Sequence, residues 1–374
     1  MLFQRSLMKR LASSLCIGTM MMLVFLPLSA HGEQNETTDA GELQKLIHEV
    51  EQNETFYTDF KLNLTSHKLD EGNLFLIDVP KPIQSETQIS LDVQGLKFRQ
   101  EDRSKGRFSV IVSGFGWLKE KPDPADASYT VAGTREWITV CDGKTTRHFW
   151  TDDIVAEKQG EQRKTSNQGE ISDKPLRLPN LARPHMFLLE NGGPKVPLST
   201  YLKGIKAIRA FPGPSDLREG LVFKVQILGS EEFQGLLCTK ILIEAIDPRG
   251  TPRNRRELWL ARDRNLIPVR NLSYTYRDSK EMPIAEAIVD EWQEVRPDVW
   301  FPLKAHYNRF NSMTVKREGL QKLSWQIKYD IKSVQMNPQF SPEEFTTLKF
   351  PPETKVNLVK DGRIIKTINP EANE

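Results

Sequence analysis

Hydrophobic and polar residues alternate with a period of two along most of this chain. "FKLNLTS" places Phe60, Leu62 and Leu64 on one side and Lys61 and Asn63 on the other, which is typical of a β-strand with one face in the core. Because short turns separate the runs, the pattern predicts an antiparallel sheet of consecutive hairpins. Further runs of this kind are "QISLDVQGLKFRQ", "GRFSVIVSGF", "EWITVCDGKTTRHFW", "GLVFKVQIL", "LLCTKILIEAI", "ELWLARDRNLIPVRNLSYTY", "AIVDEWQEV", "VWFPLKAHYNRF" and "LSWQIKYDIKSV".

Three segments depart from this period and predict helices. "TTDAGELQKLIHEVEQNE" has capping-box spacing between Asp39 and Glu42 and an apolar stripe with a helical period. "LARPHMFLLENGG", which ends at two glycines, and "STYLKGIKAI" predict short helices between the strands.

Two other segments predict irregular structure. Residues 157–175 are polar and nearly free of large apolar side chains, which favours a mobile surface loop. Prolines punctuate the C-terminal segment 336–374, with one short helical turn at "SPEEF". The expected organisation is therefore one mainly β (α+β) domain over residues 31–374.

The N-terminus has the layout of a secretory signal peptide. Arg5, Lys9 and Arg10 precede an apolar run that ends near small residues, which predicts cleavage near Ala30 or Gly32 and a periplasmic or otherwise exported protein. A retained membrane anchor is the alternative, because the run has almost the length of a membrane span.

Charge and cysteine content change this picture little. Residues 1–30 hold three of the 52 basic residues and none of the 50 acidic ones, so 49 basic face 50 acidic residues in the rest. Such a balance gives no electrostatic reason to expect nucleic acid as a partner. Cys141 and Cys238 leave two alternatives open, one disulfide or two buried free thiols.

The sequence offers little evidence of a catalytic site. It contains no G-x-S-x-G elbow, P-loop or H-E-x-x-H motif, and no two histidines have metal-ligand spacing. We therefore expect no enzyme, cofactor or metal. "RGTPRNRRELW" clusters Arg249, Arg253, Arg255 and Arg256, which favours a solvated charged loop over an anion or partner site.

Apolar area is the remaining signal. "LWL", "LIPV" and "VWFPL" are apolar at consecutive positions, as in strands covered on both faces. An ordinary core explains this pattern, and so does a strongly curved sheet that meets helices on one face and a ligand beside them.

Several segments resemble one family. "WITVCDGKTTRHFW", "ELWLARDRNLIPVRNLSY", "DEWQEVRPDVWFPLKAHY" and "MNPQFSPEEFTTLKFPPETKV" are similar to the hairpins and closing segment of the LolA/LolB-type lipoprotein-carrier superfamily, over most of residues 41–356. The resemblance implies a curved antiparallel half-barrel sheet wrapped around an N-terminal helix and short inserted helices. It also implies a hydrophobic cavity that receives acyl chains.

The leading hypothesis is thus an exported, monomeric, non-enzymatic carrier of a hydrophobic ligand, a lipid or an acylated protein. The alternative is an envelope sensor or scaffold that binds a protein through the arginine cluster. Strand parity, in which a shift of one residue would change the face, selects the cavity-lining residues Leu62, Leu64, Ile89, Leu91, Trp137, Leu258 and Leu260. The expected lid consists of Met186, Phe187 and Leu189, because Met and Phe adapt to irregular ligands.

Overall fold

The computed structural model describes residues 33–71, 83–109, 130–156, 162–164, 167–210 and 220–369. The expected signal segment, residues 1–30, lies outside them, as do residues 157–161 and 165–166 of the expected polar loop. Among the described residues, no helix combines the length and the apolar character needed to cross a membrane.

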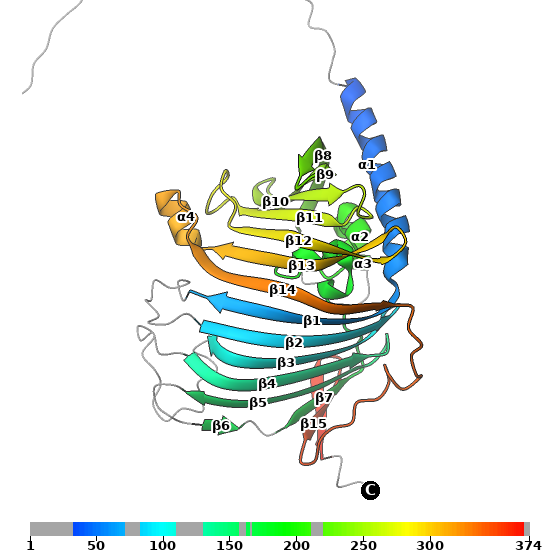
Figure 1. The fold of residues 1–374 in the computed structure, drawn as a ribbon, viewed down its shortest axis with the longest axis vertical. Coiled ribbons are helices and arrows are strands. Elements are labelled where there is room, and N and C mark those ends of the chain that lie inside the picture. The colour runs from blue at the N-terminus through cyan, green and yellow to red at the C-terminus, as the bar shows by residue number, and fades with distance from the viewer. Residues whose placement is uncertain are drawn as a thin grey trace, which may run out of the picture.

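The strands of the described residues form one sixteen-stranded, strongly curved sheet (Figure 1). Its order is β16-β15-β7-β5-β4-β3-β2-β1-β14-β13-β12-β11-β10-β9-β8, and β6 pairs with β5 beside this path. The N-terminal strands are β1 (Asp59–Asp70), β2 (Ile83–Gln94), β3 (Lys97–Ser109), β4 (Thr130–Cys141), β5 (Thr146–Ala156), β6 (Gln162–Lys164) and β7 (Gln168–Ser172). The later strands are β8 (Val222–Phe233), β9 (Leu236–Ile246), β10 (Pro252–Ala261), β11 (Pro268–Thr275), β12 (Ala285–Arg296), β13 (Val299–Phe310), β14 (Leu323–Met336), β15 (Lys355–Lys360) and β16 (Arg363–Ile368).

Two antiparallel meanders build this sheet, one from β1 to β5 and one from β8 to β14. They join where β1 pairs with β14. The predicted hairpin at Asp142-Gly143 is present between β4 and β5, and the Asp142 Oδ1 atom accepts from the amides of Lys144 and Thr145 at 2.8 and 2.7 Å. The consecutive-hairpin architecture predicted from the alternation is confirmed.

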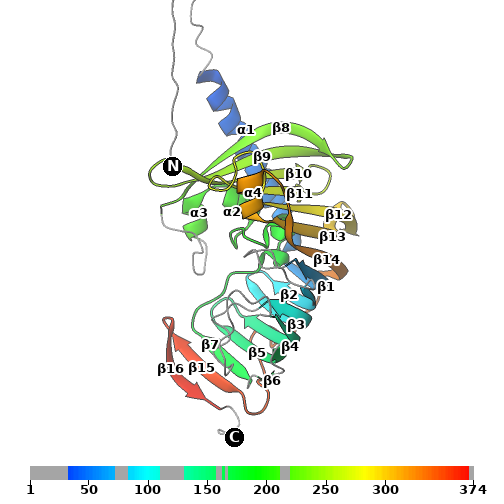
Figure 2. The same ribbon diagram turned by 90° about the vertical axis from the view of Figure 1, so that its left-hand side faces the viewer.

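The sheet curls most visibly in the β1–β5 half (Figure 2). Gly106 and Gly133 pair across β3 and β4 and have φ values of 139° and 150°. A Cβ atom on Gly133 would lie 2.0 Å from the Asp153 backbone oxygen. Glycine is thus required where neighbouring backbones approach this closely.

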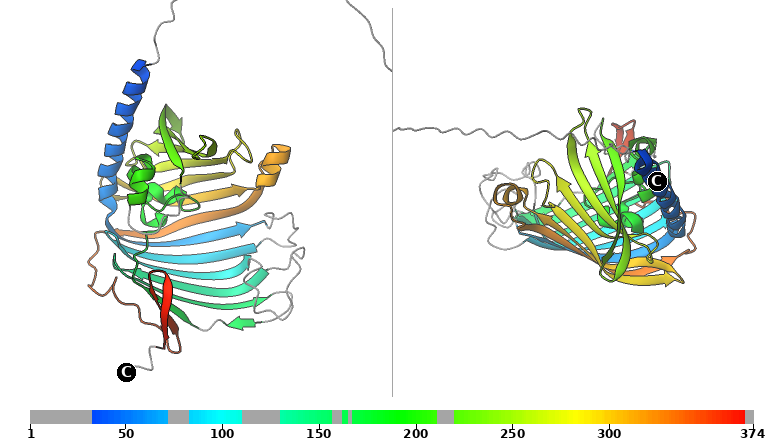
Figure 3. Two further views of the ribbon diagram at one scale, coloured as in Figure 1. Left: turned by 180° about the vertical axis from the view of Figure 1, so that it is seen from behind. Right: turned by 90° about the horizontal axis from the view of Figure 1, so that it is seen from above.

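One face of the sheet, the concave face, carries the helices. Helix α1 (Glu33–Glu54) runs along one side of the sheet, and residues 176–210, here called the insert, lie over strands of the β8–β14 half (Figure 3). The elements of the insert are the 3₁₀ helices η4 (Asn180–Ala182) and η5 (Pro184–Leu189) and the α-helices α2 (Leu198–Leu202) and α3 (Ile205–Ala210). A last short helix, α4 (Ser312–Glu318), joins β13 to β14, and the 3₁₀ helix η1 (Thr55–Tyr57) follows α1. The expected half-barrel around an N-terminal helix and short inserted helices is confirmed.

The concave face holds most of the core, in two clusters. The larger one joins β1–β4 and β9–β14 to the first part of the insert, through Leu178, Leu181, Phe187 and Leu188. The second joins α1, α2 and the end of η5 to β9 and β10. The insert therefore contributes to both clusters and holds them together.

Three details differ from the sequence-based expectation. Helix α1 begins at Glu33, so Asp39 lies inside it and does not cap it. The expected loop 157–175 contains β6 and β7, and the expected irregular segment 336–374 contains the β15–β16 hairpin. β7 pairs with β5 on one side and in parallel with β15 on the other. β15 therefore joins the sheet through a strand almost two hundred residues away, which local patterns do not reveal.

Candidate functional site

The predicted lining residues of β1 and β2 share the concave face. Leu62 pairs with Leu91 and Leu64 with Ile89 across the two strands, and residues paired in this way point to the same side. Leu62 and Leu91 are 0% exposed, Leu64 is 2% exposed and Ile89 8% exposed. All four belong to the larger core cluster, together with Phe187 of the insert. The insert therefore belongs to the same core as these positions, and its η5 helix contacts β11, β12 and β13 directly.

Leu258 and Leu260 of β10 also lie on the concave face. Both are 0% exposed and pack with helices α1 and α2. Trp259 between them points to the opposite, convex face, where the Lys240 ammonium and the Arg270 guanidinium lie 4.4 and 4.9 Å from its ring centroid. The cationic stems bury this tryptophan without any ligand.

Trp137 differs from the other predicted lining residues. It continues the concave row that runs through Leu64, Ile89 and Asp102, but its side chain is 54% exposed. Its ring centroid lies 6.4 Å from that of Trp150 on β5. The covered part of the concave face therefore ends before β4 at this level.

The expected lid residues lie in the insert and are fully covered. Met186 and Leu189 are 0% exposed and pack in the α1–α2 cluster, and Phe187 is 1% exposed and packs against the ring of Tyr329 on β14. All six residues of η5 are buried. In this conformation the expected lid thus fills the concave side of the sheet.

Buried polar contacts hold the insert on the sheet. The His185 Nε2–H group donates to the Asn265 carbonyl at 2.7 Å, and the Asn271 amide donates to the Leu188 carbonyl at 3.1 Å. The Asn191 amide donates to the Tyr329 hydroxyl at 3.0 Å. Each contact satisfies a group that would otherwise be buried without a partner.

Asn265 connects several of these elements, and sequence reasoning did not single it out. It has a φ of 54° in the turn between β10 and β11. Its side chain accepts from the Trp300 amide at 2.8 Å and donates to the Asp298 carbonyl at 2.9 Å, and it also accepts from the Tyr57 hydroxyl at 3.1 Å. The one available signal was an Asn in a charged turn, since Asn tolerates a left-handed conformation.

Burial controls the titration of groups around the insert. It lowers the pKa of His185 to about 4, because the charged imidazole would lose its hydration. Burial likewise raises the pKa of Glu190, with a smaller contribution from the nearby negative charge of Asp102, and raises the pKa of Asp102 itself. The region between the insert and β3 is thus poor in water.

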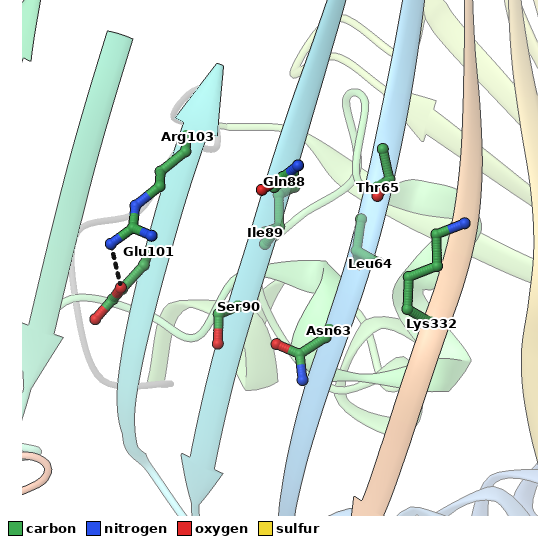
Figure 4. A pocket seen from close by; sticks show the side chains of 9 residues that line it. All are labelled: Asn63, Leu64, Thr65, Gln88, Ile89, Ser90, Glu101, Arg103 and Lys332. Atoms are coloured by element: carbon green, nitrogen blue, oxygen red, sulfur yellow. Dashed lines mark ion pairs between the residues drawn. The ribbon is translucent and has the colours of Figure 1, made fainter. Parts of the chain in front are cut away.

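Two hollows lie on the described surface, and one of them includes two of the predicted lining residues. It has about 360 Å³, lies over β1–β3, and is lined by Leu64 and Ile89 beside polar groups such as Asn63, Ser90 and Arg103 (Figure 4). The other, of about 540 Å³, lies between α1 and the β8–β9 hairpin, with Glu42, Glu49 and Arg262 among its lining residues. Both linings mix polar and apolar side chains, with Leu46, Ile227 and Leu266 as the apolar members of the second.

The arginine cluster is largely engaged within the chain. Arg253 pairs with Asp247, and Arg255 pairs with Glu257 at 3.2 Å and lies over the Tyr274 ring at 4.0 Å. Arg256 donates to the Gly192 carbonyl of the insert. These contacts give the arginines a structural role and do not favour the protein-binding alternative.

The cysteines are resolved in favour of free thiols. Cys141 and Cys238 are both buried and unpaired, and burial raises the pKa of the Cys238 thiol to about 11. In the described part of the chain, no three His, Cys, Asp or Glu side chains form a group that could hold a metal ion.

A scan of protein-family models finds no match, and a search of curated protein sequences finds none either. A search of solved structures finds a DUF1329 family protein from Desulfovibrio piger, with 12% identity, a TM-score of 0.35, and coverage of 82% of this chain and 96% of that one. It also finds a domain from Vibrio parahaemolyticus assigned to outer membrane lipoprotein sorting, with 8% identity, a TM-score of 0.37, and coverage of 82% and 97%. The lipoprotein LppX of Mycobacterium tuberculosis has 9% identity, a TM-score of 0.23, and coverage of 80% and 98%.

At TM-scores below 0.5, these likenesses transfer no ligand, partner or activity to this chain.

Proposed function

We propose that this chain is an exported, non-enzymatic binder of a lipid or an acylated protein, and that the ligand's apolar chain occupies the concave face where the insert now packs. The observation that carries this proposal is the cover of that face. A curved sheet presents Leu62, Leu91 and Leu258 to one side. The insert has no strand pairing to the sheet, shares the core clusters of these residues, and contacts β11, β12 and β13 through its η5 helix.

The insert and an acyl chain would each contribute a similar free energy by burying apolar surface on this face. Burying Met186, Phe187, Leu188 and Leu189 contributes about 1.5–3 kcal/mol for each side chain, or about 6–12 kcal/mol together. An acyl chain with about a dozen buried methylene groups contributes about 10 kcal/mol, at about 0.8 kcal/mol each. An exchange of insert for ligand on the same surface is therefore close to balanced, as reversible loading and release require.

In this proposal the insert is displaced in an open state and packed on the sheet in a closed state. The polar contacts of the insert determine how much of the protein is in the open state. If only molecules with a displaced insert bind ligand, the apparent affinity scales with the fraction displaced. A contact made only in the closed state lowers that fraction, and a typical hydrogen bond contributes about 1 kcal/mol. Weakening one such contact is therefore expected to strengthen ligand binding.

Tyr329→Phe tests this expectation, because it removes the acceptor of the Asn191 amide and keeps the ring that packs against Phe187. We expect the variant to bind a fluorescent fatty acid about fivefold more tightly, as about 1 kcal/mol implies, and to unfold at a lower denaturant concentration. Fluorescence titration of the delipidated protein measures the affinity.

Tyr276→Phe is the matched control, since its hydroxyl bonds Glu244 on the convex side and does not touch the insert. This control is expected to keep the affinity of the unmodified chain. Unchanged binding by Tyr329→Phe, or an equal gain in both variants, would contradict displacement of the insert.

A further inference from the structure

A pair of tryptophans, with Trp137 exposed and Trp150 half-buried, lies on the concave face beside the covered region. Asp102 of β3 pairs with Trp137 of β4, and Trp137 pairs with Trp150 of β5. These three residues, here called the tryptophan patch, form one row across three strands. Cross-strand neighbours of this kind have Cβ atoms about 5 Å apart, so the carboxylate and both indole rings can contact one small ligand.

The carboxylate of this patch has no cationic partner among the described residues. Both Asp102 oxygens accept from the Gln100 amide, at 2.8 and 2.9 Å. Arg135, two residues from Trp137 on the same face, is engaged elsewhere. It pairs with Asp152 at 3.6 Å, and its guanidinium lies 4.6 Å from the Phe108 ring centroid. Asp102 thus lacks a cation among the described residues, and burial raises the pKa of its carboxyl group.

These features select one class of ligand. An anion would be repelled by Asp102, and a purely apolar group would desolvate the carboxylate without giving it a partner. An organic cation meets both demands, since indole faces attract ammonium groups within about 6 Å of the ring centroid and bind their methyl groups as apolar surface. We propose that the tryptophan patch binds the ammonium head group of an amphipathic ligand.

This inference deepens the proposed function and rests on it for the apolar part of the ligand. Ile89 on β2 and Trp137 on β4 lie in one row and are two strands apart, which corresponds to about 10 Å. A ligand whose chain replaces the insert over Leu62 and Leu91 can therefore place its first polar group at the patch. The chemistry is that of a quaternary or primary ammonium head group of a lipid.

The test uses tetramethylammonium, which has the charge and the methyl groups but no chain. Saturation-transfer NMR against the mature protein is expected to show binding of tetramethylammonium and none of tert-butyl alcohol, its neutral counterpart. Asp102→Asn and Trp137→Leu are each expected to weaken binding about tenfold. Trp150→Phe, which keeps an aromatic ring, is expected to weaken it less.

Glu136→Gln is the control, because Glu136 precedes Trp137 and pairs with Arg103 on the opposite face; it should leave binding unchanged. Absence of tetramethylammonium binding, equal binding of tert-butyl alcohol, or full binding by both Asp102→Asn and Trp137→Leu would overturn the proposal. Since the probe has no chain, these outcomes are distinct from a failure to bind fatty acid, which would contradict the proposed function.

Discussion

At the scale of single residues, His185 is a titratable group of the insert that is buried in its neutral form. Its ring is 1% exposed, donates to the Asn265 carbonyl and lies edge-on to Tyr57 at 5.7 Å. Protonation would put a second donor and a net charge into this apolar site. The insert therefore requires the neutral form of His185.

This requirement predicts a pH dependence of stability. Burial lowers the pKa of His185 to about 4, below the value near 6.5 of an unfolded chain. Between these values the unfolded chain binds a proton that the folded chain does not, so the stabilising contribution is present above pH 6.5 and is lost as the pH falls towards 4. The shift corresponds to about 3 kcal/mol.

His185→Gln removes the titrating group and can keep a donor to Asn265. The unfolding free energy of the unmodified chain, minus that of the variant, is expected to fall by about 3 kcal/mol between pH 7 and pH 4 in urea titrations. Buried carboxyls such as Glu54 and Glu190, whose pKa values burial raises, are common to both proteins and largely cancel. A difference that stays constant with pH would contradict a buried neutral His185.

Strand parity predicted the orientation of several residues well. Leu62, Leu91 and Leu258 lie on the concave face as the alternation required, and Trp259 lies on the other face. The alternation did not reveal what covers each face. The other predicted lining residues are buried in core clusters that include the insert, and Trp137 is exposed, because cover depends on contacts far apart in sequence.

At the scale of elements, two kinds of structure escaped prediction for physical reasons. The β4–β5 hairpin follows from Asp142-Gly143, because its turn is local. β7 and β15 pair in parallel although almost two hundred residues separate them, so no local turn brings the two strands together. Local sequence patterns therefore could not predict pairing between distant segments.

The close approach of strands at Gly133 predicts that this position does not tolerate a side chain. Gly133→Ala would place a methyl group against the Asp153 backbone oxygen and impose a positive φ on alanine. We expect a loss of unfolding free energy of about 1–3 kcal/mol or more from backbone strain alone, measured by urea denaturation. Gly143→Ala is the control, since Gly143 has a φ of 86° but no atom within 4 Å of the added Cβ.

The control is expected to lose less than Gly133→Ala, because it adds strain without a clash. Equal losses in the two variants would mean that close packing of β4 on β5 does not set the bend.

At the scale of the whole molecule, one curved sheet carries an apolar concave face whose cover is made of short 3₁₀ and α-helical pieces. The β1–β5 half continues that face to Trp137, which is exposed, and to its neighbour Trp150. The alternation predicted the sheet, and the resemblance predicted its curvature. The sequence did not predict that side chains of the chain itself fill the concave side. This packing decides whether a ligand must displace the insert.

The central claim is that a lipid or an acylated protein occupies this concave face. It is tested most directly by native mass spectrometry, with organic extraction, of mature protein purified from its own envelope without detergent. The account predicts a stoichiometric bound lipid, or a bound acylated protein, that extraction releases. A bare protein mass, together with a Tyr329→Phe variant that takes up no fluorescent fatty acid, would contradict it.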